Sequence, residues 1–247
     1  MVQSLSKNQI KLITSLKQKK YRLLHGFFVV EGIKTIRELL NSNMELHTLY
    51  TTERFNNAAN PDSYNDEILI SETDLKRISF LTTPNKALAI FKIPSFNPID
   101  TSELIVALDD IRDPGNLGTI IRLCDWFGVK DLVCSNETVD CFNPKVIQAT
   151  MGSITRVNIT YVDLPAFLKN VDVPIFGTFM DGENVYNKSL PKKGVLVLGN
   201  EANGISKDIE VLIKEKIAIP RFGNIQAAES LNVATATAIL LSEFRRS

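Results

Sequence analysis

The sequence predicts an α/β protein with a mostly parallel sheet in its C-terminal part. Residues 104–108 and 195–198 are continuous apolar runs of the kind found in parallel strands that are covered on both faces. From residue 104 onward, such runs alternate with helical patterns, which is the order that builds a parallel sheet. The chain of 247 residues is 44% apolar and 23% charged, so it can bury a sizeable core in one large or two modest domains.

The first part of the chain predicts a smaller α/β unit. Residues 8–19 place Ile10, Ile13 and Leu16 at helical spacing among lysines. Ser71 begins an N-terminal capping sequence for a short helix. The other expected elements of this unit are strands at residues 27–30, 46–51 and 87–93, a helix at residues 31–41 and a loop at residues 56–65.

An extended linker is expected after this unit. Pro94, Pro98 and the polar residues around them have the composition of a connection rather than of a helix or strand. We therefore expect one domain at residues 1–97 and a second at residues 98–247.

The first helix of the second domain is well specified. Residues 109–115 form a turn-rich loop, and Asn116 is expected to be the N-cap of the helix that follows. Arg122 lies off the apolar stripe of this helix, and Gly128 marks its end. The stripe that packs on the sheet consists of Leu117, Ile120, Ile121 and Cys124. Further strands are expected at residues 131–135, 157–162, 173–180, 195–198 and 217–220, and further helices begin at Asn143, Ser206 and Ser230.

Polar loops follow two of these strands. Gly199, Asn200 and Glu201 come directly after residues 195–198, and a second loop begins after Pro220. Ligands of open parallel sheets bind outside the carboxyl ends of the strands, and Gly199 would let the backbone approach such a ligand. The alternative is that both loops are ordinary strand-to-helix turns.

The net charge is zero, but the charges are unevenly distributed. Residues 1–97 contain 13 Lys and Arg against 9 Asp and Glu, while residues 98–247 contain 15 against 19. A basic helix at the N-terminus could follow a phosphate backbone, or it could be a solvated helix face. Six basic residues precede the first acidic one: Lys7, Lys11, Lys17, Lys19, Lys20 and Arg22.

The few cysteines and histidines argue against a metal site. Cys124, Cys134 and Cys141 show no C-x-x-C spacing and are expected to be buried thiols, and there are only two histidines. No apolar stretch reaches the roughly 20 residues of a membrane span, and the N-terminus lacks the apolar segment of a signal peptide. A cytoplasmic location is therefore expected.

The common fingerprints of nucleotide-binding and hydrolytic enzymes do not occur. The sequence contains no G-x-G-x-x-G after a strand, no G-x-x-x-x-G-K-[ST] and no G-x-S-x-G. Dehydrogenases, P-loop NTPases and serine hydrolases are thereby disfavoured.

Three polar motifs at strand ends carry a family resemblance. They are Asp113-Pro-Gly-Asn116-Leu-Gly-Thr-Ile-Ile-Arg122, Val197-Leu-Gly-Asn-Glu201-Ala-Asn-Gly204-Ile-Ser206, and Ile219-Pro220 through Ser230-Leu-Asn232-Val233. In this order they resemble the motifs of the SpoU (TrmH-type) RNA 2′-O-ribose methyltransferases of the SPOUT superfamily. Three ordered matches are specific, whereas any one would be weak.

The resemblance implies a fold and partners that elementary rules do not predict. In this family the C-terminal segment threads a trefoil knot, the protein is a homodimer, and the substrate is a structured RNA, either rRNA or tRNA. Knots are almost absent from proteins, so this expectation rests on the resemblance alone. The first domain similarly resembles a small substrate-binding domain that is related to certain ribosomal proteins.

The resemblance also implies the site. Its catalytic positions fall on Arg122, Asn116, Glu201, Ser230 and Asn232. The positions expected to bind S-adenosylmethionine are Thr178, Leu198, Gly199, Asn200, Gly204, Ile219 and Leu231. The segment from Arg221 to Glu229 is a few residues longer than is usual in the family, so its cofactor contacts are not assigned.

Methyl transfer to a ribose hydroxyl is an in-line displacement that needs no metal, and positioning can supply much of its acceleration. Arginine keeps its proton in proteins, so we expect Arg122 to hold the RNA phosphate in a two-pronged grip and to orient the hydroxyl. An RNA-binding module of the same fold without catalysis is the alternative. Such a module would not need all three polar motifs.

Overall fold

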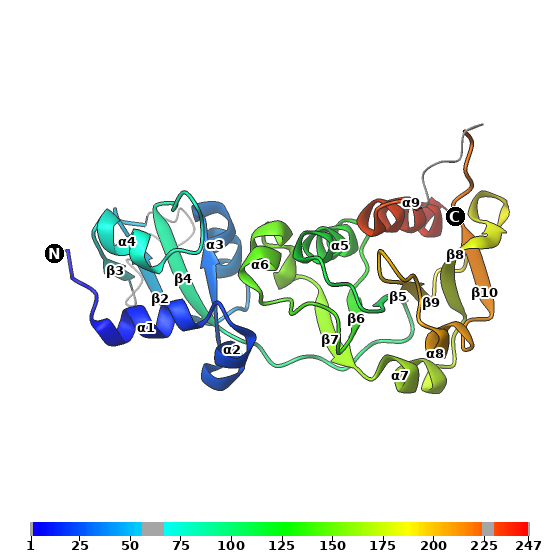
Figure 1. The fold of residues 1–247 in the computed structure, drawn as a ribbon, viewed down its shortest axis with the longest axis horizontal. Helices are drawn as coiled ribbons and strands as arrows, with labels where there is room; N and C mark the ends of the chain where they lie inside the picture. Colours follow the sequence, from blue (N-terminus) through cyan, green and yellow to red (C-terminus); the bar gives the residue numbers. More distant parts are fainter. Residues whose placement is uncertain (1, 56–66, 224–229, 247) are drawn as a thin grey trace. The chain divides into compact units, whose positions relative to one another are not determined.

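The computed structural model describes residues 2–55, 67–223 and 230–246. The chain forms two units, and both are drawn in Figure 1. Unit 1 consists of Met1–Ser95 together with Asp140–Thr155, and unit 2 consists of Phe96–Val139 together with Arg156–Ser247. The expected loop at residues 56–65 lies outside the described residues.

Unit 1 is built on a four-stranded sheet in the order β1-β4-β2-β3, in which β4 is antiparallel to β1 and β2, and β2 is parallel to β3. Its elements are α1 (Lys7–Ser15), α2 (Lys19–His25), β1 (Phe27–Glu31), α3 (Ile33–Leu40), β2 (Leu46–Thr51), β3 (Glu67–Leu69), α4 (Glu72–Ile78), β4 (Ala87–Lys92), α6 (Pro144–Thr150) and the 3-10 helix η1 (Ser153–Thr155). Helix α2 and strand β3 are elements that the sequence pattern did not reveal.

Local signals in the sequence explain where the helices of unit 1 begin. Ser6 and Gln9 form a reciprocal capping box at the start of α1. The hydroxyl of Ser71 accepts a hydrogen bond from the backbone N–H of Asp74 at 3.1 Å, which confirms the predicted cap of α4. Ile13 and Leu16, from the predicted apolar stripe, are fully buried.

The predicted second domain, residues 98–247, differs from the structure at residues 140–155, which lie in unit 1. Helix α6 packs on β1, and the ring of Phe142 lies 4.7 Å from that of Phe28. Phe142, Val146 and Ile147 are at most 5% exposed, so burial of these apolar side chains holds the segment in unit 1.

Unit 2 contains a six-stranded sheet in the order β10-β8-β9-β5-β6-β7, in which all pairs are parallel. Its elements are β5 (Leu104–Leu108), α5 (Pro114–Trp126), β6 (Asp131–Ser135), β7 (Asn158–Val162), α7 (Leu164–Asn170), β8 (Ile175–Asn184), the 3-10 helix η2 (Val185–Asn187), β9 (Gly194–Leu198), α8 (Lys207–Glu210), β10 (Glu215–Ala218) and α9 (Val233–Arg246). The parallel sheet is thus confirmed, while α7 was not expected.

The order of these strands defines where a ligand can bind. From β5 the chain proceeds outward through β6 and β7 and then continues on the other side of β5 with β8, β9 and β10. Helices α5 and α9 cover one face of the sheet, and α7 and α8 cover the other (Figure 1). Open sheets of this kind bind ligands beside the carboxyl ends of the strands where the order reverses.

Two predicted helix starts in unit 2 are wrong. The N-cap of α5 is Asp113, whose carboxylate accepts a hydrogen bond from the N–H of Asn116 at 2.7 Å. Pro114 follows the cap because the first helical position needs no N–H donor. Helix α9 begins at Val233 instead of Ser230, and Asn232 caps it. The predicted stripe of α5 is confirmed: Leu117, Ile120, Ile121 and Cys124 are fully buried.

Candidate functional site

A cavity of about 620 Å³ lies at the carboxyl ends of β8, β9 and β10, beside the first turns of α9. Leu240, Val233 and Ile217 give it an apolar floor, and Glu201 and Ser230 add polar groups to its wall. All seven positions predicted to bind a cofactor line this cavity: Thr178, Leu198, Gly199, Asn200, Gly204, Ile219 and Leu231.

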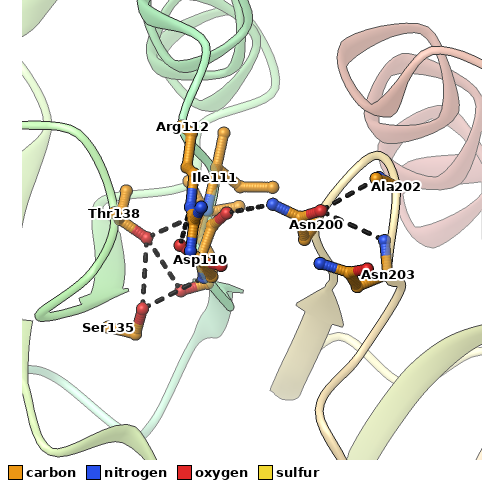
Figure 2. Close-up of polar contacts among 9 residues, drawn as sticks. Asp110, Ile111, Arg112, Ser135, Thr138, Asn200, Ala202 and Asn203 are labelled. Carbon is orange, nitrogen blue, oxygen red and sulfur yellow. Dashed lines mark hydrogen bonds and ion pairs between the residues drawn. The ribbon is translucent and has the colours of Figure 1, made fainter.

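Asn200 folds the loop after β9. Its side-chain oxygen accepts from the backbone N–H groups of Ala202 at 2.9 Å and Asn203 at 3.1 Å, and its Nδ2 donates to the carbonyl of Asp110 at 2.7 Å (Figure 2). Its backbone also exchanges two hydrogen bonds with Gly204, at 3.0 and 2.8 Å. The side-chain amide of Asn200 therefore shapes the cavity wall.

The fold of the loop after β9 gives a further reason for glycine at position 199. A Cβ at this position would lie 2.2 Å from the carbonyl carbon of Gly204 and 2.3 Å from the nitrogen of Ile205. These are backbone atoms that cannot move aside independently. Glycine is therefore required here because the loop folds back on itself, and Gly199 also lines the cavity as predicted.

The loop that leads from β5 into α5 is fixed from two sides (Figure 2). Asp110 has a left-handed backbone with φ of 56°, which is uncommon for a residue with a side chain. Its N–H donates to the hydroxyl of Ser135 at 3.0 Å, and its carbonyl accepts from Asn200. Thr138 accepts from the N–H of Ile111 at 3.3 Å. These contacts hold a strained residue just before the helix that carries the first motif.

Asn116, Glu201 and Asn232 form one hydrogen-bonded chain, which joins the three motifs. Nδ2 of Asn232 donates to Oδ1 of Asn116 at 2.9 Å, and Nδ2 of Asn116 donates to Oε1 of Glu201 at 2.7 Å. Oδ1 of Asn232 accepts from the N–H groups of Ala234 at 3.0 Å and Thr235 at 3.2 Å. Because these N–H groups can only donate, they fix the orientation of both amides.

The two remaining predicted catalytic residues lie outside this chain. Ser230 is exposed and lines the cavity. Arg122 is exposed on α5, as expected from its place off the apolar stripe. Among the described residues, no hydrogen bond connects its guanidinium to Asn116, Glu201 or Asn232.

Of the six residues predicted to bind RNA, Lys7, Lys11, Lys17, Lys19 and Lys20 are exposed on or beside α1 and α2. The prediction is wrong for Arg22, which is only 2% exposed. Its Nη1 donates to the carbonyls of Leu16 at 2.8 Å and Lys17 at 2.9 Å, and its Nε donates to Asp140 at 2.9 Å. A guanidinium buried and bonded in this way is not accessible to a phosphate.

Arg221 lines the cavity, although no cofactor contact was predicted for it from the sequence. It lines the cavity with Gly223, and its Nη2 lies 3.7 Å from the sulfur of Met180. Residues 224–229, for which no contacts were assigned either, lie outside the described residues. The only sequence signal for Arg221 was a cation directly after a strand-end proline.

The three cysteines are buried free thiols, as predicted. Burial raises the pKa of the Cys124 thiol far above its usual range, with a smaller contribution from Asp125. Within residues 2–55, 67–223 and 230–246, no three His, Cys, Asp or Glu side chains come together as a metal site. No helix in that part of the chain has the length and apolar character needed to cross a membrane.

The fold and the site together define an α/β protein that binds a small molecule at the carboxyl edge of a parallel sheet and brings polar side chains from three loops to it. Residues 103–242 match the SpoU rRNA Methylase family, and residues 7–89 match the MRM3-like substrate binding domain. The chain belongs to the SpoU rRNA methylase family.

Relatives match the chain over nearly its whole length. It is 27% identical to the 23S rRNA (guanosine(2553)-2'-O)-methyltransferase RlmP of Bacillus subtilis (strain 168), covering 99% of this chain and 98% of the relative. A TrmH-family protein from Porphyromonas gingivalis has a structure with a TM-score of 0.88 and 39% identity, covering 99% of both chains. An AdoMet-bound rRNA methyltransferase from Sinorhizobium meliloti gives a TM-score of 0.84 and 31% identity, covering 99% of this chain and 97% of that one.

Proposed function

We propose that the protein transfers a methyl group from S-adenosylmethionine to a ribose 2′-hydroxyl of rRNA or tRNA. The observation that carries the proposal is the hydrogen-bonded chain of Asn232, Asn116 and Glu201, whose carboxylate lines the cavity. A module that only binds RNA has no need for three polar side chains aligned beside a cavity for a small molecule. Relatives of this protein are named as 2′-O-methyltransferases, which supports a catalytic function over a module that only binds RNA.

The residues present fit the cofactor. The cavity of about 620 Å³ falls within the roughly 300–1,000 Å³ that is typical of small-molecule sites. Leu240 and Ile217 suit an apolar or aromatic part of the ligand, and the carboxylate of Glu201 suits its positive charge. When bound, S-adenosylmethionine supplies an activated methyl group on a positively charged sulfur.

The protein's contribution to the reaction is positioning. The Asn116 amide holds Oε1 of Glu201 in place, and the N-cap bonds of Asn232 hold Asn116. Arg122 is well suited to grip the RNA phosphate beside the reacting ribose, because its planar guanidinium presents two parallel donors. Orientation of this kind can supply a large share of the rate enhancement of a displacement between two bound partners.

The proposal extends to the assembly. From the resemblance to the family we propose a C-terminal trefoil knot, a ribosomal-protein-like first domain and a homodimer, and we keep a cytoplasmic location as part of the proposal. Two large apolar side chains of unit 2, Trp126 and Phe222, are each 82% exposed, and a homodimer could bury them. A second copy covering such side chains could also bring its own Arg122 to the site, which would explain why this residue stands apart from the other catalytic positions.

Two measurements test the function. Isothermal titration should show binding of S-adenosylmethionine but not of ATP or NAD. Incubation with radiolabelled S-adenosylmethionine and rRNA from cells that lack the protein should transfer label to ribose 2′-oxygens. Binding of ATP or NAD without S-adenosylmethionine, or cofactor binding without any transfer to rRNA or tRNA, would contradict the proposal.

A further inference from the structure

Unit 1 contains a second cavity, which the proposed reaction does not use. Its volume is about 140 Å³, and it lies at the end of β2, beside α3 and the start of β4. It is too small for a whole cofactor, since small-molecule sites usually have roughly 300 Å³ or more. A single phosphate or ribose is closer to its size. The lining residues that matter here are Arg37, Thr51, Glu53, Arg54, Phe55 and Lys86.

The charge around this cavity favours an anion. Arg37, Arg54 and Lys86 are exposed cations, and Glu53 is the one carboxylate among its described lining residues. Glu53 pairs with Lys86, with an N–O distance of 2.8 Å. The described lining residues thus include three cations and one carboxylate, so their formal charges sum to a net positive charge. Guanidinium groups match the geometry of phosphate oxygens better than ammonium groups do.

The cavity wall is held in place by hydrogen bonds. Oε1 of Glu67, on β3, accepts from the backbone N–H of Phe55 at 2.8 Å and from the hydroxyl of Thr51 at 2.8 Å. The N–H of Thr52 donates to the carbonyl of Lys86 at 3.1 Å. Glu67 thereby ties down both ends of the segment that carries Arg54. Strand β3 thus supports the cavity wall through Glu67, and the wall is more than a chance grouping of surface cations.

An aromatic ring positions one of the cations. The guanidinium carbon of Arg37 lies 5.5 Å from the ring centroid of Phe55, within the range of a cation–π contact. A guanidinium held over a ring loses less freedom when it binds an anion. Single-stranded RNA presents phosphates next to bases and riboses that contact aromatic and arginine side chains.

We propose that this cavity binds one phosphate of the substrate RNA backbone, with Arg37 and Arg54 as the ligating cations. The inference rests on the proposed function for the identity of the polymer. It adds an RNA contact within residues 7–89, the part that matches a substrate binding domain. This contact is separate from the lysines of α1 and α2, none of which lines the cavity.

The test compares two double variants of the full chain that remove the same charge. Arg37→Ala/Arg54→Ala removes both guanidinium groups of the cavity, and Lys76→Ala/Arg77→Ala removes two exposed cations of α4 that do not line it. The probe is 23S rRNA purified from cells that lack the protein, and its Kd is measured between 50 and 200 mM salt. Arg54→Glu serves as a second cavity variant, and melting curves check folding.

The Arg37→Ala/Arg54→Ala variant should bind the rRNA roughly 10-fold more weakly. The negative slope of log K against log salt should become shallower by about 1, the value for one lost phosphate contact. The α4 variant should change both quantities much less. Affinity for S-adenosylmethionine should stay unchanged in both. Equal losses in the two double variants, or no loss in either, would overturn the proposal.

Two further results separate this proposal from others. Titration of the wild-type protein with inorganic phosphate and with AMP tests whether the cavity binds a small free phosphate compound instead of RNA. The assignment to RNA would be overturned if the wild-type protein binds phosphate or AMP, if Arg37→Ala/Arg54→Ala abolishes that binding, and if the rRNA affinity of this variant is unchanged. If the wild-type protein transfers no methyl group to any RNA but the cavity variant still loses rRNA affinity selectively, the cavity proposal stands and the proposed enzymatic function fails.

Discussion

The side-chain amide of Asn232 donates to Asn116 at 2.9 Å, while its oxygen accepts from the N–H groups that begin α9. One residue therefore caps the last helix and orients the polar chain beside the cavity. The two tasks depend on different atoms of the same amide, so substitutions can separate them.

Changing Asn232 to Asp should separate stability from activity. Aspartate is as good an N-cap as asparagine and favours the positive helix N-terminus, so the melting temperature should stay close to that of the wild type. It cannot donate to Asn116, whose amide would turn its N–H toward the new carboxylate and its oxygen toward Glu201. Single-turnover methyl transfer should fall at least about 10-fold, because the site loses its orientation.

Asn232→Ala is the matched variant. It loses the cap as well as the donor, so the free energy of unfolding should drop by roughly 0.5–2 kcal/mol in addition to the loss of activity. A wild-type rate in the aspartate variant would show that the hydrogen bond from Asn232 to Asn116 has no catalytic importance.

Arg122→Ala should leave folding intact. The side chain is exposed, and surface changes usually cost within about 0.5 kcal/mol. Affinity for S-adenosylmethionine should also persist, whereas methyl transfer should fall by roughly two orders of magnitude or more. Arg122→Lys should be impaired too, because an ammonium group lacks the two-pronged donor geometry. Near-normal transfer by the alanine variant would make Arg122 an ordinary surface residue.

Gly199→Ala should destabilise the wall of the cofactor cavity. The added methyl group would overlap backbone atoms of Gly204 and Ile205, so we expect a loss of roughly 3 kcal/mol, at the upper end of overpacking changes, and weaker cofactor binding. Gly204→Ala is the control, since a Cβ there meets no described atom within 4 Å and only the φ of 68° is unfavourable. That variant should lose about 1–2 kcal/mol. Equal effects of the two variants on cofactor titration and melting would contradict this account.

Glu31 should make the stability of unit 1 depend on pH. Burial raises the pKa of its carboxyl group above the ordinary 4.5, although hydrogen bonds from the hydroxyl of Ser79 and the N–H of Phe80 oppose the shift. The folded state therefore favours the protonated form. The stability that protonated Glu31 gives to the folded state is fully present below pH 4.5 and is lost as the pH rises through the raised pKa.

Glu31→Gln removes this titration and can still hydrogen-bond to both partners. Urea unfolding from pH 4 to pH 7.5 should show the variant gaining stability relative to the wild type as the pH rises, until the difference levels off. A difference that stays constant over this range would show that Glu31 titrates alike in the folded and unfolded states.

Deleting residues 1–97 should leave α6 without its partner strand. Phe142, Val146 and Ile147 pack within unit 1 and would become exposed in the fragment. We expect residues 98–247 to bind a dye for apolar surface and to melt at a lower temperature than the full chain, because exposing each such side chain costs roughly 1.5–3 kcal/mol. Equal melting temperatures and no dye binding would contradict the assignment of this segment to unit 1.

The sequence predicts the sheet of unit 2 well because its signals are local. The apolar runs at residues 104–108 and 131–135 coincide with β5 and β6, and Gly128 follows the end of α5. The location of the candidate site was predicted because loops at the carboxyl ends of parallel strands meet at one edge, whereas its individual residues were predicted from the resemblance of the three motifs to the family. The structure joins three of those residues, Asn116, Glu201 and Asn232, by hydrogen bonds.

The prediction for Arg22 failed because its partner is distant along the chain. Arg22 belongs to a run of basic residues, and nothing near it in the sequence reveals the buried bond to Asp140. The need for glycine at position 199 comes from backbone atoms of the returning loop. The cap of α5 is a different case, since Asp113 followed by Pro114 is a local signal that Asn116 obscured.

The position of residues 140–155 in unit 1 bears on how this unit could be exchanged between relatives. A chimera that takes only residues 1–95 from another protein would place a foreign surface against α6, and Asp140 would lose the guanidinium of Arg22 unless the foreign stretch supplied a cation in its place. A graft that carries both stretches would keep these contacts within one parent. Unit 1 is thus discontinuous along the chain, and homologous recombination at a single crossover near residue 95 would separate its two stretches.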